Sequence, residues 1–516
     1  MSNSSETNPT GFIAFIERVG KRIPDPVIIF IYFLVGALIL TALIGGLTFE
    51  TYGAGGAPVV HEIRNMLARE NVVWLFDNAL LANWLGFGGG VLGVILIVML
   101  GVGIAEHSGL FAAVLKKVSR GLPVKFLPLF LVFIGIMSSI ATDAGYLILI
   151  PLAGLLYAGL GKNPLIGMAA AFAGVSAGFS ANLIPATPID VIIGENARIF
   201  AEAQGIPFVN AAGETLTPAT MHYYFILVST FVLAIVGAWV TLKFVGPRLE
   251  QKEFTIPEEL RISDFDVTPE EKRGLRASGI ALLAALAAVY GLAVGPLAPY
   301  TNEAGVEVTP FLNNIILLIT FVFAAIGIAF GVASGKFKSM MDVVKAMVKQ
   351  MDTMGYILVL TFFCYNFLGV LSYSGLGAYI TFLGANALTG MGLQSFPVLL
   401  LIGFVIVTAI INLFVGGLTS KWMLLGPIFI PMLYMVNPAM TPDLVAAAFR
   451  VADSATNIIT PMMSYAGIIL AFMRKYNPQL TFGEMIAMML PYSIAFMLVW
   501  IALLVGFFSF GIPLGF

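Results

Sequence analysis

Two stretches of the chain, AAAFAGVSAGFSANLIP at 169–185 and AAAFRVADSATNIITP at 446–461, share one pattern that decides the fold. Each begins with small and apolar residues, continues into a polar segment that contains an asparagine, and ends at a proline. A membrane helix broken in this way has unpaired backbone groups, which must lie inside protein or beside water. Because the stretches belong to opposite halves of the chain, they predict an internal repeat with a transporter's substrate site at the two breaks.

A second apolar segment with its own polar interruption precedes each stretch. The interruption reads SSIATDAG at 138–145 in the first half and GGLTSKW at 416–422 in the second half. The surrounding segments, 126–160 and 398–436, are long enough to enter a membrane and turn back. We therefore predict a re-entrant hairpin for each of them, with its polar centre away from lipid.

The composition requires a lipid environment. Hydrophobic residues make up 59% of the 516 residues and charged residues only 10%, and the mean hydropathy is +0.97. A soluble core cannot bury this much apolar surface, so we expect an all-α integral membrane protein in contact with lipid. The formal net charge of −2 argues against a nucleic-acid partner. The single cysteine, Cys364, excludes an intrachain disulfide framework and a cysteine-based zinc cluster.

Apolar runs of about 20 residues predict nine transmembrane helices. They cover 26–48, 87–106, 164–185, 221–246, 276–297, 311–334, 353–371, 443–472 and 484–512. The predicted organisation is an N-terminal segment (1–25), a first half (26–246) with hairpin 126–160 and broken helix 164–185, a linker (247–275), and a second half (276–516) with hairpin 398–436 and broken helix 443–472. The glycines at 88–90, 93, 101 and 103 indicate close helix packing.

Basic residues predict the orientation of the helices. Loops near 116–125, 243–276, 336–349 and 474–475 carry the lysines and arginines, and they fall on one side if the two hairpins do not cross. The positive-inside rule makes that side cytoplasmic, so the N-terminus lies inside and the C-terminus outside. The opposite loops, including 190–202 and 303–307, are acid-leaning, and 336–352 reads as an amphipathic helix along the cytoplasmic interface. The two halves are then inverted in the membrane, which implies alternating access.

Ionisable residues at membrane depth are costly and usually functional. Asp143, Arg450 and Asp453 meet this criterion. Arg450 and Asp453 lie three residues apart on one helix, so they can pair with each other or bind a substrate anion and a cation or proton. A structural ion pair is the alternative, although the matching stretch of the first half, 173–177, carries no charge.

The first hairpin and its broken helix offer a candidate ion site. Hard oxygen ligands around a broken helix suit Na⁺, with Asp143 and Asn182 as the main ligands, and an acid with a raised pKa can carry H⁺ instead. Asp143 has a second interpretation, as the cap of the returning half-helix. The full candidate set is Ser138, Ser139, Thr142, Asp143 and Asn182.

The second half offers an equivalent polar group, made of Asn412, Thr419, Ser420, Trp422 and Asn457. Trp422 is interpreted either as a membrane-interface residue or as an aromatic face that stacks on a ring of the substrate. Asp190, which follows the first broken helix, is either an ordinary loop acid or a member of the site.

The sequence is similar to the AbgT family of p-aminobenzoyl-glutamate transporters, within the ion transporter superfamily. The similarity covers nearly the whole chain and is carried by SSIATDAGY at 138–146, GFSAN at 178–182 and the stretch from Arg450 to Pro461. It implies a homodimer in the bacterial inner membrane, with nine helices and two hairpins per protomer arranged as an inner core and an outer scaffold. It also implies transport of p-aminobenzoyl-glutamate, p-aminobenzoic acid or sulfonamides, driven by Na⁺ or H⁺, with no other cofactor.

The resemblance assigns functional roles to individual residues. Substrate contacts are implied for Asp190, Asn412, Thr419, Trp422, Arg450 and Asp453, with Pro438 or Pro442 nearby, and ion-coupling roles are proposed for Ser420 and Asn457 alongside the first-half set.

Two rival functions remain. A passive channel requires a continuous polar stripe, and a membrane-embedded amidase requires a nucleophile and base or a metal site, yet no histidine lies mid-span and Cys364 has no base near it in sequence.

Overall fold

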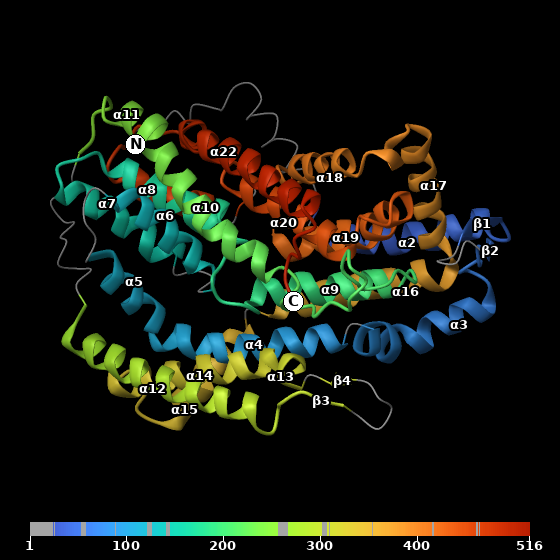
Figure 1. The fold of residues 1–516 in the computed structure, drawn as a ribbon, viewed down its shortest axis with the longest axis horizontal. Coiled ribbons are helices and arrows are strands. Elements are labelled where there is room, and N and C mark those ends of the chain that lie inside the picture. Colours follow the sequence, from blue (N-terminus) through green and yellow to red (C-terminus); the bar gives the residue numbers. More distant parts are fainter. Residues whose placement is uncertain are drawn as a thin grey trace, which may run out of the picture.

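The structure is a computed structural model that describes residues 24, 26–52, 58–87, 89–120, 126–140, 145–255, 267–301, 307–308, 310–352, 354–414, 417–460, 463 and 465–516. The described residues form helices and two short antiparallel ribbons, β1 (Thr48–Tyr52) with β2 (Pro58–Glu62) and β3 (Tyr300–Thr301) with β4 (Glu307–Val308). Figure 1 shows a layer of helices that runs along one side of a larger helical body.

The outer layer contains residues from both halves of the chain. It consists of α4 (Gly89–Ser108), α5 (Leu110–Arg120), α12 (Pro269–Val294), α13 (Pro310–Asn313), α14 (Ile315–Ala333) and α15 (Met340–Asp352). Helix α14 packs between α4 and α12, and α15 packs on α4. Small residues permit the α4–α14 contact, because a Cβ on Gly101 would lie only 2.4 Å from the carbonyl oxygen of Thr320. The glycine-packing prediction is confirmed at Gly101, whereas Gly93 has nothing within 4 Å of its Cβ position.

The first half supplies most of one end of the larger body. Its elements are α6 (Leu127–Met137), the 3₁₀ turn η3 (Ser138–Ile140), η4 (Gly145–Leu149), α7 (Ile150–Gly159), α8 (Pro164–Phe172), the π-helix η5 (Ala173–Ala177), α9 (Pro188–Glu202), α10 (Tyr223–Val240), η6 (Thr241–Val245) and α11 (Gly246–Leu249). The broken helix is confirmed, since η5 ends at Ala177 and α9 begins at Pro188.

The second half supplies the other end, together with the N-terminal helices. Its elements are α16 (Gly355–Ser374), α17 (Leu376–Gly390), η8 (Leu393–Ser395), α18 (Pro397–Asn412), α19 (Leu418–Val436), α20 (Pro442–Asn457), α21 (Ala466–Arg474) and α22 (Phe482–Ser509), and beside them lie α2 (Pro26–Ile44), α3 (Arg69–Asn78) and η1 (Ala79–Phe87). The second break is confirmed between Asn457, where α20 ends, and Ala466, where α21 begins.

Two sequence predictions about elements need correction. The segment 190–202, predicted as an external loop, is part of the buried helix α9. Its start is fixed by a capping box between Thr187 and Asp190, with Pro188 at the first helical position. The linker predicted at 247–275 ends earlier, because α12 already begins at Pro269 behind the capping box of Thr268 and Glu271.

Seven helices of the described part are long and apolar enough to cross a membrane: Val27–Ile44, Tyr223–Leu249, Pro269–Val294, Ile315–Ala333, Gly355–Ser374, Leu418–Val436 and Phe482–Ser509. Six of them match predicted spans, and Leu418–Val436 falls in the predicted second hairpin. The other predicted spans contain shorter or interrupted helices, including Leu96–Ser108 and Pro164–Ala177. These candidate spans support a multi-pass helical membrane protein, while the number of spans and the re-entrant course of the hairpins stay predictions.

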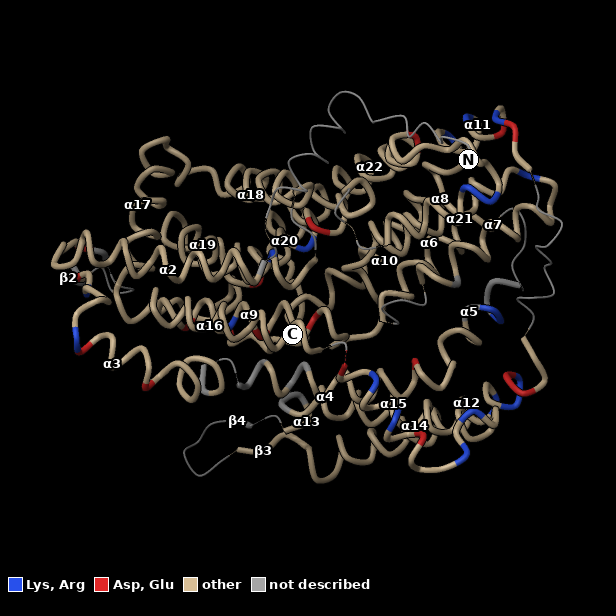
Figure 2. The backbone as a smooth tube through the Cα atoms, turned by 180° about the vertical axis from the view of Figure 1, so that it is seen from behind, with Lys and Arg blue, Asp and Glu red and all other residues tan. Residues whose placement is uncertain are grey.

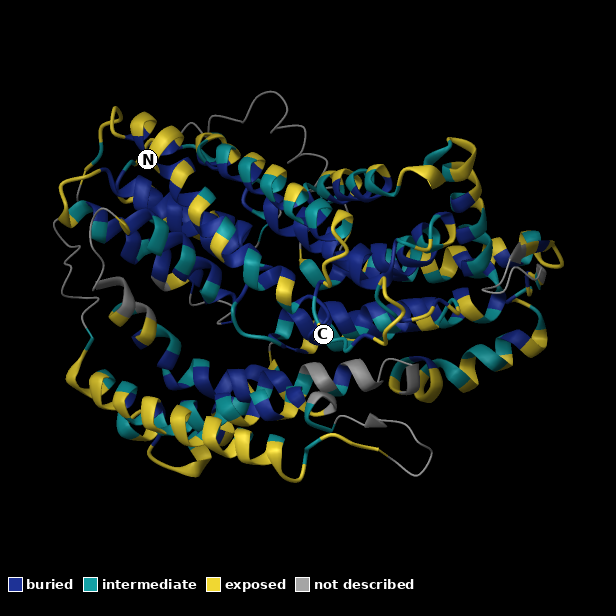
Figure 3. Cartoon of the chain, viewed as in Figure 1, coloured by how far each residue is buried: buried dark blue, intermediate teal, exposed yellow. Residues whose placement is uncertain are grey.

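Helix α12 on the outside of the molecule is far more exposed than the central helices of the larger body. Figure 3 shows α12 of the outer layer largely exposed, whereas α8, α9 and α20 of the larger body are mostly buried. The helix predicted over 336–352 forms as α15 from Met340 to Asp352 and buries Val343 and Ala346 on one face, while its place along the cytoplasmic interface stays a prediction. In Figure 2 much of the basic charge lies at the end of the molecule that holds α5, α11 and the start of α12.

Candidate functional site

The site lies where the two broken helices meet in the larger body. Helix α20 packs against η5, α9, α18, α19 and α22, and every residue from Pro442 to Thr456 is buried. The hydroxyl of Ser454 donates a 2.7 Å hydrogen bond to the hydroxyl of Ser180, which lies in the break of the first half. The repeat predicted from sequence thus brings residues about 270 positions apart into direct contact.

Arg450 forms its ion pair across this contact. Its Nη2 donates to Asp190 Oδ1 at 2.6 Å and to the carbonyl oxygen of Ser180 at 2.9 Å. Both partners of the ion pair are buried. Of the alternatives left open by the sequence, a pair between Arg450 and Asp453 is wrong for this structure, because each binds a partner from another element.

Asp190 is positioned by the start of α9. Its Oδ2 accepts hydrogen bonds from the backbone N–H of Thr187 at 2.9 Å and from the Thr187 hydroxyl at 2.7 Å. The carboxylate therefore caps its own helix with one oxygen and holds Arg450 with the other. The loop-acid interpretation of Asp190 is wrong, because the residue is 3% exposed and lies within a helix.

His222 adds a neutral group beside Arg450. Its Nδ1 lies 3.3 Å from Arg450 Nη1, and its Nε2 lies 2.8 Å from the carbonyl oxygen of Asp443. A guanidinium can only donate, so Nδ1 is the acceptor and Nε2 carries the proton that is donated to the carbonyl. Arg450 Nε is also buried, and it has no acceptor within the described part of the chain.

A second buried ion pair joins α19 to α20. Lys421 Nζ binds Asp453 Oδ1 and also contacts Asn412 Oδ1. Lys421 and Asp453 are 1% and 0% exposed. The Asn412 amide nitrogen donates to the Asp453 carbonyl oxygen and to Thr456 Oγ1, both at 2.6 Å. Asn412 therefore links the end of α18 to the lysine and to α20.

Asn457 completes this group at the second break. Its Oδ1 accepts from Asn412 Nδ2 at 3.2 Å, and its own Nδ2 donates to Asp453 Oδ2 at 3.4 Å. Thr460 then donates to the Asn412 carbonyl oxygen at 3.1 Å, which ties the residue after the break to α18. The broken end of α20 is thus stabilised by side chains in the absence of a continuing helix.

The first half has an analogous arrangement, whose described members Ser138, Ser139 and Asn182 are uncharged. Asn182 Nδ2 donates to Ser139 Oγ at 2.9 Å, and Asn182 Oδ1 accepts from the backbone N–H of Ile184 at 2.9 Å. The hydroxyl of Ser138 donates to the Gly135 carbonyl oxygen at 2.6 Å. Thr142 and Asp143, which the sequence placed in the same ion site, lie outside the described residues.

Trp422 is packed inside the protein. Its side chain is 0% exposed, its ring lies 4.7 Å from that of Phe449 and 5.9 Å from that of Phe200, and its Nε1 donates to the Ile193 carbonyl oxygen at 3.0 Å. The membrane-interface interpretation is therefore wrong. In this conformation the Trp422 ring packs α19 against α9 and α20. A substrate contact of Trp422 stays a prediction. The preceding Ser420 is buried and Thr419 is half-buried.

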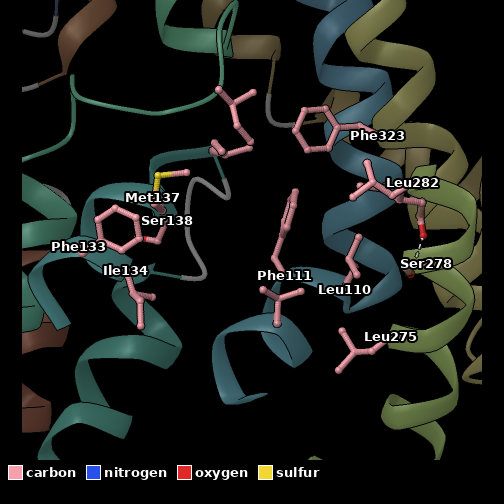
Figure 4. A pocket seen from close by; sticks show the side chains of 15 residues that line it. Leu110, Phe111, Phe133, Ile134, Met137, Ser138, Leu275, Ser278, Leu282 and Phe323 are labelled. Carbon is pink, nitrogen blue, oxygen red and sulfur yellow. Dashed lines mark hydrogen bonds between the residues drawn. The ribbon is translucent and has the colours of Figure 1, made fainter. Parts of the chain in front are cut away.

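An apolar cavity of about 480 Å³ separates the outer layer from the first half of the larger body. Figure 4 shows Phe111 of α5 between Phe133 of α6 and Phe323 of α14. The lining also includes Ser138 and Ile184, the residues beside the Ser139–Asn182 hydrogen bond. The cavity volume lies within the usual range for a small-molecule site, and its mostly apolar lining with few polar groups is typical of one.

Sequence reasoning missed three residues of this centre. Lys421 lies inside the quoted GGLTSKW segment, where a lysine within a polar interruption of an apolar run was an available signal. His222 and Asp443 precede or begin helices, and nothing in their local sequence distinguishes them from residues at a membrane surface. His222 reaches Arg450 and the backbone carbonyl oxygen of Asp443 only in the folded chain.

Comparisons with known proteins agree with this architecture. The family model described as the AbgT putative transporter family matches residues 11–516. The p-aminobenzoyl-glutamate transport protein of Escherichia coli (strain K12) is 28% identical over 523 residues, which cover 100% of this chain and 98% of that protein.

Two solved structures have the same fold. The YdaH transporter of Alcanivorax borkumensis, with 34% identity and a TM-score of 0.85, is matched over 95% of this chain and 100% of that one. MtrF of Neisseria gonorrhoeae, described as representing a class of antimetabolite efflux pumps, has 34% identity and a TM-score of 0.83, with 96% of this chain and 97% of that one covered. The relatives are transporters or efflux pumps rather than enzymes, so the amidase alternative fails. A helical membrane fold with paired broken helices, matched over nearly its whole length to these proteins, places the chain in the AbgT transporter family.

Proposed function

We propose that this transporter moves p-aminobenzoyl-glutamate, p-aminobenzoic acid and similar aromatic acids, and exports sulfonamide antimetabolites, by alternating access driven by a Na⁺ or H⁺ gradient. The observation that carries the proposal is the buried Arg450 guanidinium, whose Nε–H has no acceptor in the described part of the chain. Because Nη2 and Nη1 already have partners, this Nε–H is a donor left for an anion, and a charge-assisted hydrogen bond from it suits the carboxylate of a substrate.

The apolar cavity suits the other end of such a substrate. Its aromatic lining, with Phe111 and Phe133, can contact a benzoyl ring. Ile184 of the lining and Ser180, whose carbonyl oxygen accepts from Arg450, both belong to the break between η5 and α9. An aromatic acid bound in this way would place its ring and its anion on two sides of the break between η5 and α9.

Ion coupling is assigned to the two breaks. The Asn182–Ser139 pair offers oxygens at the first break, and in the second half the same role is given to Asn457, at the end of α20, and to Ser420, in the first turn of α19. We propose nine spans and two re-entrant hairpins, with the halves inverted and the broken helices moving relative to the outer layer.

Homodimer formation in the bacterial inner membrane belongs to the same proposal, and the mass of the purified protein in detergent tests the dimer.

Transport into proteoliposomes tests the proposed function. We expect uphill, saturable movement of p-aminobenzoyl-glutamate when a Na⁺ or H⁺ gradient is imposed, and no accumulation when both gradients are collapsed. The Asn182→Ala variant, which loses the hydrogen bond to Ser139, should change the ion dependence of this flux. Flux that never exceeds equilibrium and does not saturate would favour the passive channel instead.

Orientation has an independent test. We expect a cysteine at exposed position 212 to react with an impermeant reagent added outside the cell, and a cysteine at exposed position 338 to react only after the membrane is opened. The native Cys364 is buried, so it gives little background. Reaction of position 338 from outside would contradict the cytoplasmic placement of α15 and the inverted arrangement.

A further inference from the structure

The Lys421 ammonium lies beside the broken helix α20, and the broken helices of secondary transporters commonly coordinate a coupling cation. Its ammonium is 1% exposed and contacts Asp453 Oδ1 and Asn412 Oδ1 at the end of a broken helix. A buried ammonium is strongly disfavoured unless oxygens replace its water. Oxygens from a carboxylate and an amide are also the ligands that hard metal cations prefer.

The predicted internal repeat allows the polar residues at the second break to be compared with those at the first. Asn457 before the proline of the second break has a counterpart in Asn182 before the proline of the first, and each is hydrogen-bonded to a side chain of the predicted hairpin that precedes it, Asn412 and Ser139 respectively. In the aligned stretches Ser176 takes the place of Asp453. The second half therefore carries a carboxylate in its broken helix, and Lys421 neutralises it with a positive charge that is permanently attached to α19.

We propose that the Lys421 ammonium is a tethered cation that occupies a monovalent-cation site in the second half, so that no free Na⁺ binds there. The inference rests on the proposed transport function and narrows it: of the two breaks with a proposed role in ion coupling, only the first takes a free ion, and the second takes its positive charge from Lys421. A free coupling ion is then confined to the first half, and the charge at the second break moves with α19 rather than with solution ions. Removing the ammonium while leaving its space open should convert the second break into a Na⁺ site.

Three variants separate the effect of the Lys421 positive charge from the effect of the volume that its side chain fills. Lys421→Ala removes the ammonium and leaves room beside Asp453 and Asn412, whereas Lys421→Met removes the charge but fills most of the room. Lys421→Ala combined with Asp453→Ala removes both charges. All are purified at high Na⁺ and then tested with radioactive ²²Na⁺ at equilibrium, with choline replacing Na⁺ at constant ionic strength.

We expect Lys421→Ala to bind one more Na⁺ per protomer than the wild type, and Lys421→Met and the double variant to bind no extra ion. If Lys421→Ala does not fold, Lys421→Ser leaves similar room and adds a hydroxyl oxygen, and the same gain is expected. Equal Na⁺ binding by the wild type, the folded small variant and Lys421→Met would overturn the inference. Because binding is measured without flux, this result is independent of whether the transport proposal holds.

Discussion

Replacing Arg450 with methionine should abolish transport and lower the free energy of unfolding by about 3–5 kcal/mol, because the Asp190 carboxylate is left buried without its cation. The substitution keeps a long side chain, so the loss is electrostatic more than steric. Thermal unfolding in detergent measures the stability, and uptake into proteoliposomes measures the activity.

Asp190→Asn provides the control for the charge that Arg450→Met leaves unpaired. Asp190→Asn removes the negative charge but keeps an oxygen that can accept from Thr187, so the cap of α9 survives. We expect Arg450→Met combined with Asp190→Asn to regain most of the lost stability and none of the transport. A double variant that transports at the wild-type rate would show that the pair serves folding alone.

Adding one methyl group to Gly101 should destabilise the outer layer by about 1–3 kcal/mol, since the new Cβ would lie 2.4 Å from a backbone oxygen of Thr320 that cannot rotate away. Helices α4 and α14 would have to separate. Gly93→Ala on the same helix is the matched control, because nothing lies within 4 Å of its Cβ position and alanine favours helix by up to about 1 kcal/mol.

The two glycine variants are compared by thermal unfolding and by expression level in the membrane. We expect a lower unfolding temperature for Gly101→Ala and an unchanged or higher one for Gly93→Ala. Equal behaviour of the two variants would contradict the close α4–α14 contact. The comparison also separates helix propensity from packing, because both substitutions make the same chemical change.

The sequence by itself determined most of the long apolar helices and the two breaks. Long apolar runs must lie in lipid or in a helical core, and a polar segment with an asparagine and a proline interrupts a helix, so the breaks between Ala177 and Pro188 and after Asn457 followed from the local sequence. Arg450 and Asp453 were recognisable for the same reason, since charge within an apolar segment is visible in one dimension.

Only the tertiary structure decided which groups pair. Arg450 binds Asp190 from the other half, and Asp453 binds Lys421 from α19, because packing of α20 against α9 and α19 brings those side chains within reach. Helix α9 was predicted as a loop because its acids and its arginine resemble a solvated segment. The structure shows instead that Asp190 is buried, where it caps the helix with Thr187 and binds Arg450. Local sequence sets the cost of burying each charge, but the partner that offsets this cost is chosen by contacts between segments hundreds of residues apart.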